Sequence, residues 1–256
     1  GNGTCRPNTD TADCVGRQRP AEARDHFFGH DDRQLVDVTQ MPWRAVGLLT
    51  LEDGSCSGIL IAPNLVATAA HCMAGEAGAQ SKAVNFRAGA RGDTDLGSAS
   101  IISVVVAPNY SNESAPPGGG NGDDWAILTL DRDLGTQVGF VRPYVLGKAD
   151  VAAIRSGRLL VSQAGYSWDT GSNLSGHLDC QVLMAYRDGS FIHTCDTTQG
   201  DSGSPIMTLR NGEWRLIAVD SQFYDPQPPF PQMSSSHLAV DTRAFEDALR
   251  RAGALD

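Results

Sequence analysis

Short apolar runs separated by turn residues fill the chain from about Trp43 onward. In the first half they lie at residues 45–49, 57–61, 65–68, 84–87, 101–106 and 125–130. Each run has the length of a strand and is bounded by Gly, Pro, Asn or Asp, so each predicts a β-strand. The second half repeats the pattern at residues 158–161, 180–185, 204–209 and 214–219.

A helical period is visible only near the end of the chain. The apolar positions that share one helical face are Ala244, Phe245, Ala248 and Leu249. Asp241 or Thr242 can cap this helix, and Gly253 follows it. Two sets of short strands and one final helix predict an all-β fold, with two packed six-stranded antiparallel β-barrels and a C-terminal helix.

The same pattern suggests a division of the chain. We expect an N-terminal extension that is a candidate pro-segment, two barrels and a terminal helix, at residues 1–26, 27–135, 136–240 and 241–256. Residues 134–150 show neither period and are interpreted as a connector. The extension is polar and differs in composition from everything after it.

Composition and charge narrow the classes of function. The chain has 256 residues, 41% of them hydrophobic, and a net charge of −10. A nucleic-acid partner is not expected, because phosphate binding needs a basic face. A membrane partner is not expected either, because no apolar run is long enough to span a bilayer. We expect a monomer.

The six cysteines favour disulfides over a metal site. They fall into three pairs that are local in sequence: Cys5 and Cys14, Cys56 and Cys72, Cys180 and Cys195. Fifteen pairings are possible, and the clustering favours these three. A Cys-x-x-Cys spacing is absent from the sequence, so zinc is not expected, nor is any other metal or cofactor. Three disulfides would indicate an oxidising compartment, so the protein is expected to be secreted or periplasmic.

A serine nucleophile is indicated by the stretch Gly200-Asp201-Ser202-Gly203-Ser204-Pro205. The glycines permit a tight turn that exposes the Ser202 hydroxyl, and the backbone N–H groups of Gly200 and Ser202 would form an oxyanion hole. The following residues, 205–209, have the pattern of a strand. An α/β-hydrolase elbow needs a helix at this point, which argues against a lipase or esterase.

A base and a carboxylate for this serine lie far upstream. His71 ends an apolar strand and precedes Cys72, whereas the other five histidines lack such a setting. Asp124 begins an apolar strand and would hold the imidazole, with Asp123 as its more solvated rival. The chain order His71, Asp124, Ser202 is that of the chymotrypsin-type triad.

Three stretches together carry a resemblance to a known family. Residues 68–72 (TAAHC), 124–128 (DWAIL) and 200–205 (GDSGSP) resemble the catalytic blocks of the trypsin/chymotrypsin family. Residues 28–33, 41–46 and 195–200 resemble its bacterial branch, which includes the glutamyl endopeptidases. The resemblance implies hydrolysis of peptide bonds through an acyl-enzyme at a cleft between two barrels. Protein or peptide substrates, and a protein inhibitor, are the partners that it implies.

The resemblance also assigns the substrate-binding pocket. Its walls should be residues 196–199, which include Gln199, residues 218–223, and the region of His237. Asp196 resembles the pocket-floor aspartate of trypsin, which favours Arg or Lys before the scissile bond. The alternative is that Asp196 only braces its own loop.

Glutamyl specificity is less well supported by these residues. Thr197 matches a threonine that binds the substrate carboxylate in glutamyl endopeptidases, but their histidine is replaced by Asp220. A second carboxylate would repel a glutamate side chain, and His237 would neutralise one of the aspartates. Ser221 is expected to bind the substrate backbone and to help hold Asp124.

Asp201 raises the question of activation. In trypsin-like zymogens the matching aspartate pairs with a new N-terminal amine, so we expect cleavage between about Arg24 and Phe28 to mature the enzyme. The alternative is that Asp201 makes a hydrogen bond within its own loop. A non-catalytic or zymogen-locked member of the fold, acting as a binding protein, is the alternative to an enzyme.

Overall fold

The computed structural model describes residues 25–26, 32–52, 54–73, 83–111, 120–167, 169–198, 201–223 and 237–255. The predicted Cys5–Cys14 disulfide therefore lies outside the described residues, as does the predicted extension up to residue 24. The two other predicted disulfides, Cys56–Cys72 and Cys180–Cys195, are present.

The first barrel closes from six antiparallel strands in the order β3-β4-β5-β8-β7-β6. They are β3 (Val46–Leu51), β4 (Gly54–Ala62), β5 (Leu65–Thr68), β6 (Ala83–Ala88), β7 (Gly97–Val106) and β8 (Ala126–Leu130). Every one overlaps a strand predicted from the apolar runs. β8 begins one residue later than expected, after Trp125.

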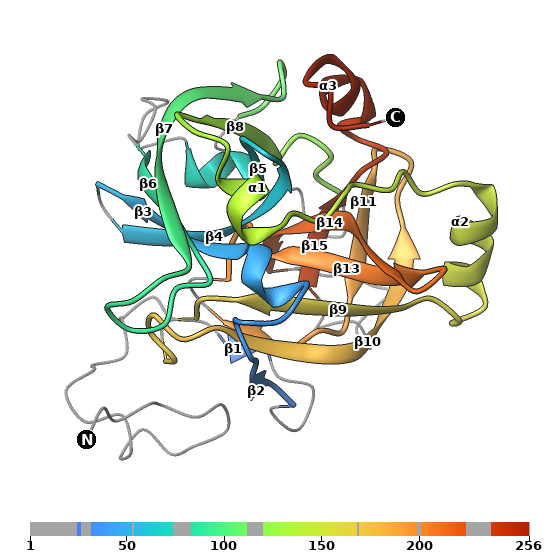
Figure 1. Cartoon of the computed structure of the whole chain (residues 1–256). Helices are drawn as coiled ribbons and strands as arrows, with labels where there is room; N and C mark the ends of the chain where they lie inside the picture. Colours follow the sequence, from blue (N-terminus) through green and yellow to red (C-terminus); the bar gives the residue numbers. More distant parts are fainter. Residues whose placement is uncertain are drawn as a thin grey trace.

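The second barrel has six strands as well, in the order β11-β15-β14-β13-β9-β10, and it closes through pairing of β10 with β11. They are β9 (Leu160–Gly165), β10 (Ser175–Ala185), β11 (Ser190–His193), β13 (Pro205–Arg210), β14 (Glu213–Phe223) and β15 (His237–Asp241). The predicted fold is therefore confirmed, and Figure 1 shows the barrels side by side. The apolar runs did not predict β11 or β15.

Two very short strands early in the chain pair with strands of its second half. β2 (Gln34–Leu35) pairs with β10, although residues 27–135 were assigned to the first barrel. β1 (Asp25–His26) pairs with β12 (Thr197–Thr198), a strand in the predicted pocket wall. Pairs of two residues leave no periodic signal in a sequence, so these strands were not predicted. The domain boundaries stay a prediction.

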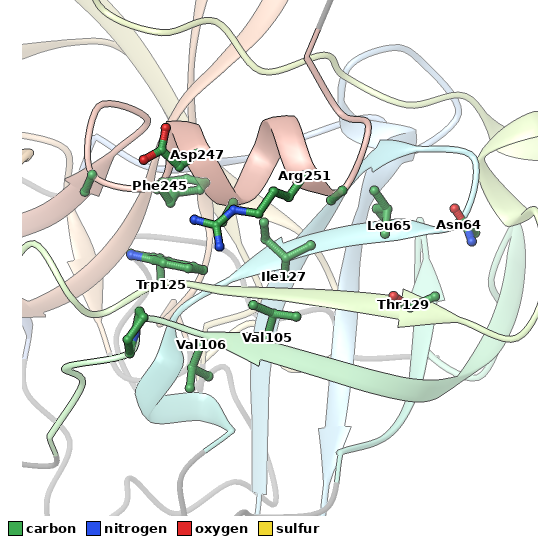
Figure 2. Close-up of a pocket in the computed structure, with 14 residues that line it drawn as sticks. Asn64, Leu65, Val105, Val106, Trp125, Ile127, Thr129, Phe245, Asp247 and Arg251 are labelled. Atoms are coloured by element: carbon green, nitrogen blue, oxygen red, sulfur yellow. The ribbon is translucent and has the colours of Figure 1, made fainter.

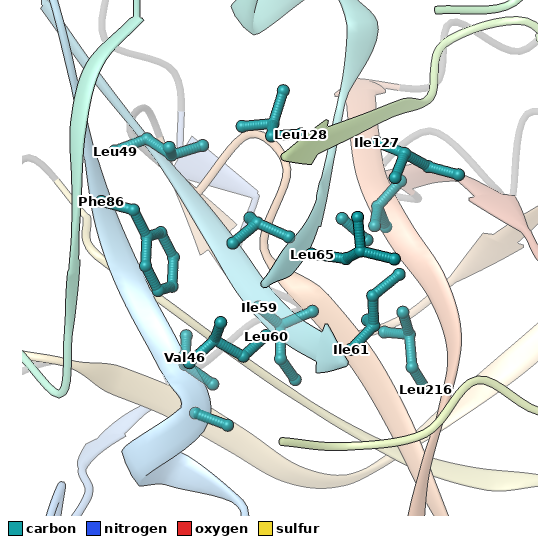
Figure 3. Packing of buried hydrophobic residues seen from close by; sticks show 14 of the residues in the cluster. Val46, Leu49, Ile59, Leu60, Ile61, Leu65, Phe86, Ile127, Leu128 and Leu216 are labelled. Carbon is teal, nitrogen blue, oxygen red and sulfur yellow. The ribbon is translucent and has the colours of Figure 1, made fainter. Parts of the chain in front are cut away.

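Apolar side chains fill the first barrel and the seam beside it. Leu49, Ile59 and Phe86 are completely buried, and Figure 3 shows them packed with Leu128 from the opposite wall. Fully burying such a side chain contributes about 1.5–3 kcal/mol. Leu216 of β14 belongs to the same cluster, so the two barrels share apolar packing.

In the described residues, three short α-helices lie outside the barrels: α1 (Leu134–Val138), α2 (Lys148–Arg155) and α3 (Glu246–Arg251). The stretch at residues 134–150, interpreted as a connector, contains α1 and the start of α2, which the apolar pattern did not predict. In α2, the Asp150 carboxylate accepts the N–H of Gly147 at 2.7 Å and pairs with Arg210 at 2.8 Å. A distant strand therefore helps to stabilise a helix with a weak local signal.

The predicted terminal helix is present but starts later than its expected caps. Asp241 ends β15, and its carboxylate accepts hydrogen bonds from Arg243. The Thr242 hydroxyl donates to the Tyr144 carbonyl at 2.6 Å, so neither side chain caps α3. In the described part of the chain, none of the helices has the length and apolar character needed to cross a membrane.

Candidate active site

Asp124 holds His71 through two hydrogen bonds. Its Oδ2 lies 2.7 Å from the His71 Nδ1, and its Oδ1 accepts the His71 backbone N–H at 2.8 Å. The Ser221 hydroxyl donates to the same Oδ2 at 2.5 Å. The imidazole is therefore fixed in orientation at its Nδ1 edge, while 37% of its side-chain surface remains exposed to solvent.

The pKa values of this pair shift in opposite directions. Burial lowers the pKa of His71, but the Asp124 carboxylate outweighs burial, so this pKa lies above its ordinary value. Burial raises the pKa of Asp124, but His71 and the hydrogen bond from Ser221 together lower it by more than burial raises it. This pKa therefore lies below its ordinary value. The pair thus favours an imidazolium beside a carboxylate, which is the charge state that a general base creates when it takes a proton.

A chain of local contacts ties the histidine turn to the serine turn. His71 lies in a single helical turn, Ala70–Cys72, directly after β5, and the disulfide joins Cys72 to Cys56 in β4. The next residue, Ser57, donates its N–H to the Ser202 carbonyl at 2.9 Å. Sequence reasoning did not identify Ser57, because the motif around it has no catalytic signature.

The turn that carries Ser202 is held from the other side by β14. Gly203 donates its N–H to the Asp220 carbonyl at 2.9 Å, and Asp220 donates its own N–H to the Ser204 carbonyl at 2.9 Å. Gly203 has φ +77°, so the turn needs a glycine at this point. Gly200, the other residue of the predicted oxyanion hole, lies outside the described residues, as does Gln199.

Asp196 is completely buried, and its carboxylate is already engaged. Its Oδ2 accepts the Asp32 backbone N–H at 2.7 Å and lies 3.5 Å from the His177 Nδ1. The side-chain atoms of Asp32, His177 and Asp196 that could bind a metal ion lie within 4.8 Å of one another. His177 Nδ1 also accepts the Asp196 N–H at 2.8 Å, so internal hydrogen bonds already occupy this group. Such contacts brace the loop, in line with the second interpretation of Asp196.

Asp220 lies between two histidines. Its Oδ1 is 2.9 Å from the His193 Nε2, and its Oδ2 is 3.2 Å from the His237 Nε2. The expected neighbour His237 is therefore present, and His193 is an additional one that sequence reasoning missed. Thr197, also assigned to the pocket, is completely buried.

Asp201 is buried beside Ser202, the predicted nucleophile. Its Oδ1 accepts the Ser167 hydroxyl, a partner 34 positions away, at 2.8 Å. The predicted role of this carboxylate in activation is not tested by that contact.

A separate groove of about 670 Å³ lies between the first barrel and α3 (Figure 2). Trp125 and Ile127 form part of its floor, and Phe245, stacked on Trp125 with ring centroids 5.6 Å apart, lines its helix side. Its lining does not include His71 or Ser202, so we do not assign this groove to the peptide substrate.

Comparison with known proteins places this geometry in a family. The model of the trypsin family matches residues 33–233. The chain is 27% identical to a CLIP domain-containing serine protease B9 of Anopheles gambiae, over 73% of this chain and 55% of the relative. It is 26% identical to a glutamyl endopeptidase of Bacillus licheniformis, over 80% and 62%, and 29% identical to a trypsin of Saccharopolyspora erythraea, over 68% and 78%.

A solved structure agrees with the fold. The structure of a Glu endopeptidase in complex with MPD superposes with a TM-score of 0.70 at 23% identity, covering 88% of this chain and 97% of the other. The chain spans 55% and 62% of the length of the first two curated relatives. Because the family model matches well over half of the chain, this protein belongs to the trypsin family of serine proteases.

Proposed function

We propose that this protein is a secreted serine endopeptidase that hydrolyses peptide bonds through an acyl-enzyme. Ser202 is the nucleophile, His71 is its general base, and Asp124 orients His71. The backbone N–H groups of Gly200 and Ser202 form the oxyanion hole. Protein or peptide substrates are the partners of this family; monomeric behaviour and a protein inhibitor stay predictions.

The observation that supports this proposal best is the paired contact of Asp124 with His71. A carboxylate that accepts both the backbone N–H and the ring Nδ1–H fixes the tautomer, which leaves Nε2 to accept the proton of the serine. The hydrogen bond from Ser221 adds a third donor to the same carboxylate. Burying the Asp124 carboxyl group among three donors is costly unless it is ionised and accepts their hydrogen bonds.

Substrate preference and activation are the finer parts of the proposal. The Arg or Lys preference predicted from Asp196 requires a basic side chain to compete with the Asp32 N–H for that carboxylate. Activation by cleavage between Arg24 and Phe28 would place a new terminus near β1, which pairs with the pocket-wall strand β12. If the intact chain hydrolyses peptides at the full rate of the cleaved chain, this activation step is wrong.

The test is labelling of the 256-residue chain with a fluorophosphonate, followed by peptide mapping. Label on Ser202, lost in Ser202→Ala and strongly slowed in His71→Ala, is the expected result. Absence of label both before and after a limited cut near Arg24 would refute the enzyme and favour a non-catalytic binding protein. Label that appears only after the cut would support the activation step.

A further inference from the structure

A buried cluster of His193, Asp220 and His237 lies directly behind the nucleophile turn. The three residues come from neighbouring strands, since β15 pairs with both β11 and β14, and His193 is opposite His237. They are 0%, 1% and 6% exposed. The backbone of Asp220 also holds the Ser202 turn, so this cluster is part of the same wall that supports the catalytic serine.

One contact in the cluster determines which ring nitrogen of His193 carries the proton. His193 Nδ1 accepts the Cys195 backbone N–H at 3.1 Å, so this ring carries its proton on Nε2. Nε2 then donates to Asp220 Oδ1 at 2.9 Å. Burial lowers the pKa of His193 to about 3, which keeps this imidazole neutral. His193 therefore supplies a hydrogen bond to Asp220 and no charge.

The buried cluster is most stable when it carries no net charge. Burial raises the pKa of Asp220 well above its ordinary value, and a completely buried unbalanced charge is costly. One proton shared between Asp220 and His237, whose facing atoms are 3.2 Å apart, makes the pair neutral. A substrate side chain with a full positive or negative charge would then find no net opposite charge here.

Two buried polar atoms of the predicted pocket lack hydrogen-bond partners among the described residues. One is the hydroxyl oxygen of Thr197; the other is the Oδ2 of Asp220, which meets no hydrogen-bond geometry, lies 3.2 Å from the His237 Nε2 and keeps a lone pair to spare. Buried polar atoms in native proteins are nearly always satisfied, so each calls for a partner that binding would bring. A hydroxyl can donate, and a carboxylate oxygen can accept, or donate when it is protonated.

We propose that the primary specificity site of this protease takes an uncharged carboxamide side chain, glutamine or asparagine, before the scissile bond. The amide N–H₂ of the substrate would contact Asp220 Oδ2, and its carbonyl oxygen would accept the Thr197 hydroxyl. A carboxamide offers both a donor and an acceptor, so it fits the cluster wherever the shared proton lies. This proposal rests on the proposed protease function and replaces the Arg or Lys preference predicted from Asp196.

The experiment uses the full chain and internally quenched peptides that differ only at the residue before the scissile bond: Gln, Asn, Glu, Lys or Arg. We expect kcat/KM for Gln or Asn to exceed that for the three charged residues by about tenfold or more, because a site built for hydrogen bonds rejects mismatched groups strongly. Asp220→Asn should reduce the ratio of the Gln to the Glu rate about tenfold. Exposed Asp247→Asn is the control with the same chemical change.

A second pair of variants guards against a general loss of structure. Thr197→Val removes the hydroxyl and should reduce the Gln to Glu ratio, mainly through KM, whereas Thr197→Ser keeps the hydroxyl and should preserve it. Fluorophosphonate labelling of Ser202 is measured in parallel. If Ser202 labels but charged residues are preferred, or no residue is, the substrate class is overturned alone. If Ser202 labels neither in the intact chain nor after a limited cut near Arg24, the protease function falls and the substrate class falls with it; if it labels only after the cut, the peptides are measured on the cut chain.

Discussion

Replacing Gly203 with alanine tests how the serine turn is built. Gly203 has φ +77°, where an L-residue costs about 1–2 kcal/mol. A Cβ at this position would also collide with the Thr68 hydroxyl, and it would lie 2.5 Å from the Ser57 carbonyl oxygen and 3.0 Å from the Ala69 backbone nitrogen. Two of these three neighbours are backbone atoms, so the turn itself must move. Steric overpacking of this kind adds about 1–3 kcal/mol.

The chain contains a matched control for the backbone term. Gly212, in the tight turn between β13 and β14, also has φ +77°, and a Cβ there would meet nothing within 4 Å. The free energy of unfolding should therefore fall by about 1–2 kcal/mol in Gly212→Ala, which pays only the conformational cost. It should fall by about 2–5 kcal/mol in Gly203→Ala. The difference between the two variants isolates the contact with Thr68, Ser57 and Ala69.

Two measurements on these variants decide the outcome. Denaturant titration gives the free energy of unfolding of each variant, and the rate of fluorophosphonate labelling reports the position of Ser202. A displacement of about 1 Å typically lowers such a rate about 10²-fold, so Gly203→Ala should label about that much more slowly than Gly212→Ala. Equal stability losses and equal labelling rates in the two variants would refute this account of the turn.

Three further predictions concern the triad and its support. Asp124→Asn should lower the acylation rate about 10⁴-fold, measured with a chromogenic ester, because the amide stabilises the wrong His71 tautomer; a loss below tenfold contradicts the assigned role. The pKa of His71 is raised above 6.5 and only neutral His71 accepts a proton, so kcat/KM should rise with pH through a midpoint above 6.5; a lower midpoint would contradict the Asp124 contact. Replacing both Cys56 and Cys72 with alanine should cost about 3 kcal/mol in denaturant unfolding; no loss would show that the bridge contributes nothing.

Local signals predicted the strands whose apolar runs are several residues long. All six strands of the first barrel were found this way, because each contains an apolar run that is bounded by turn residues. β11 and β15 escaped because polar residues occupy both ends of each strand, in SFIH and HLAVD, and leave only two or three apolar residues in a row. α2 escaped because part of its stabilisation comes from Arg210, which lies 60 positions from Asp150.

The assigned residues of the candidate site divide in the same way. His71 and Asp124 each sit at the edge of an apolar strand within a short motif, so their pairing was predicted and their contact is present. His193 has no motif of its own, and its partner Asp220 is 27 positions away. The surroundings of Asp196 depend on Asp32, 164 positions earlier, so its burial was not predictable from its own loop.

The sequence alone determined the family, the two-barrel fold and two disulfides, because each is encoded by short motifs or by apolar periodicity; the order of the proposed triad residues comes from the same motifs. Only the tertiary structure decided which charged groups face one another. It placed Asp220 between two histidines and Asp196 against the Asp32 backbone. The physical reason is that electrostatic environment depends on distance and burial in space, and neither is recorded in the local pattern of residues.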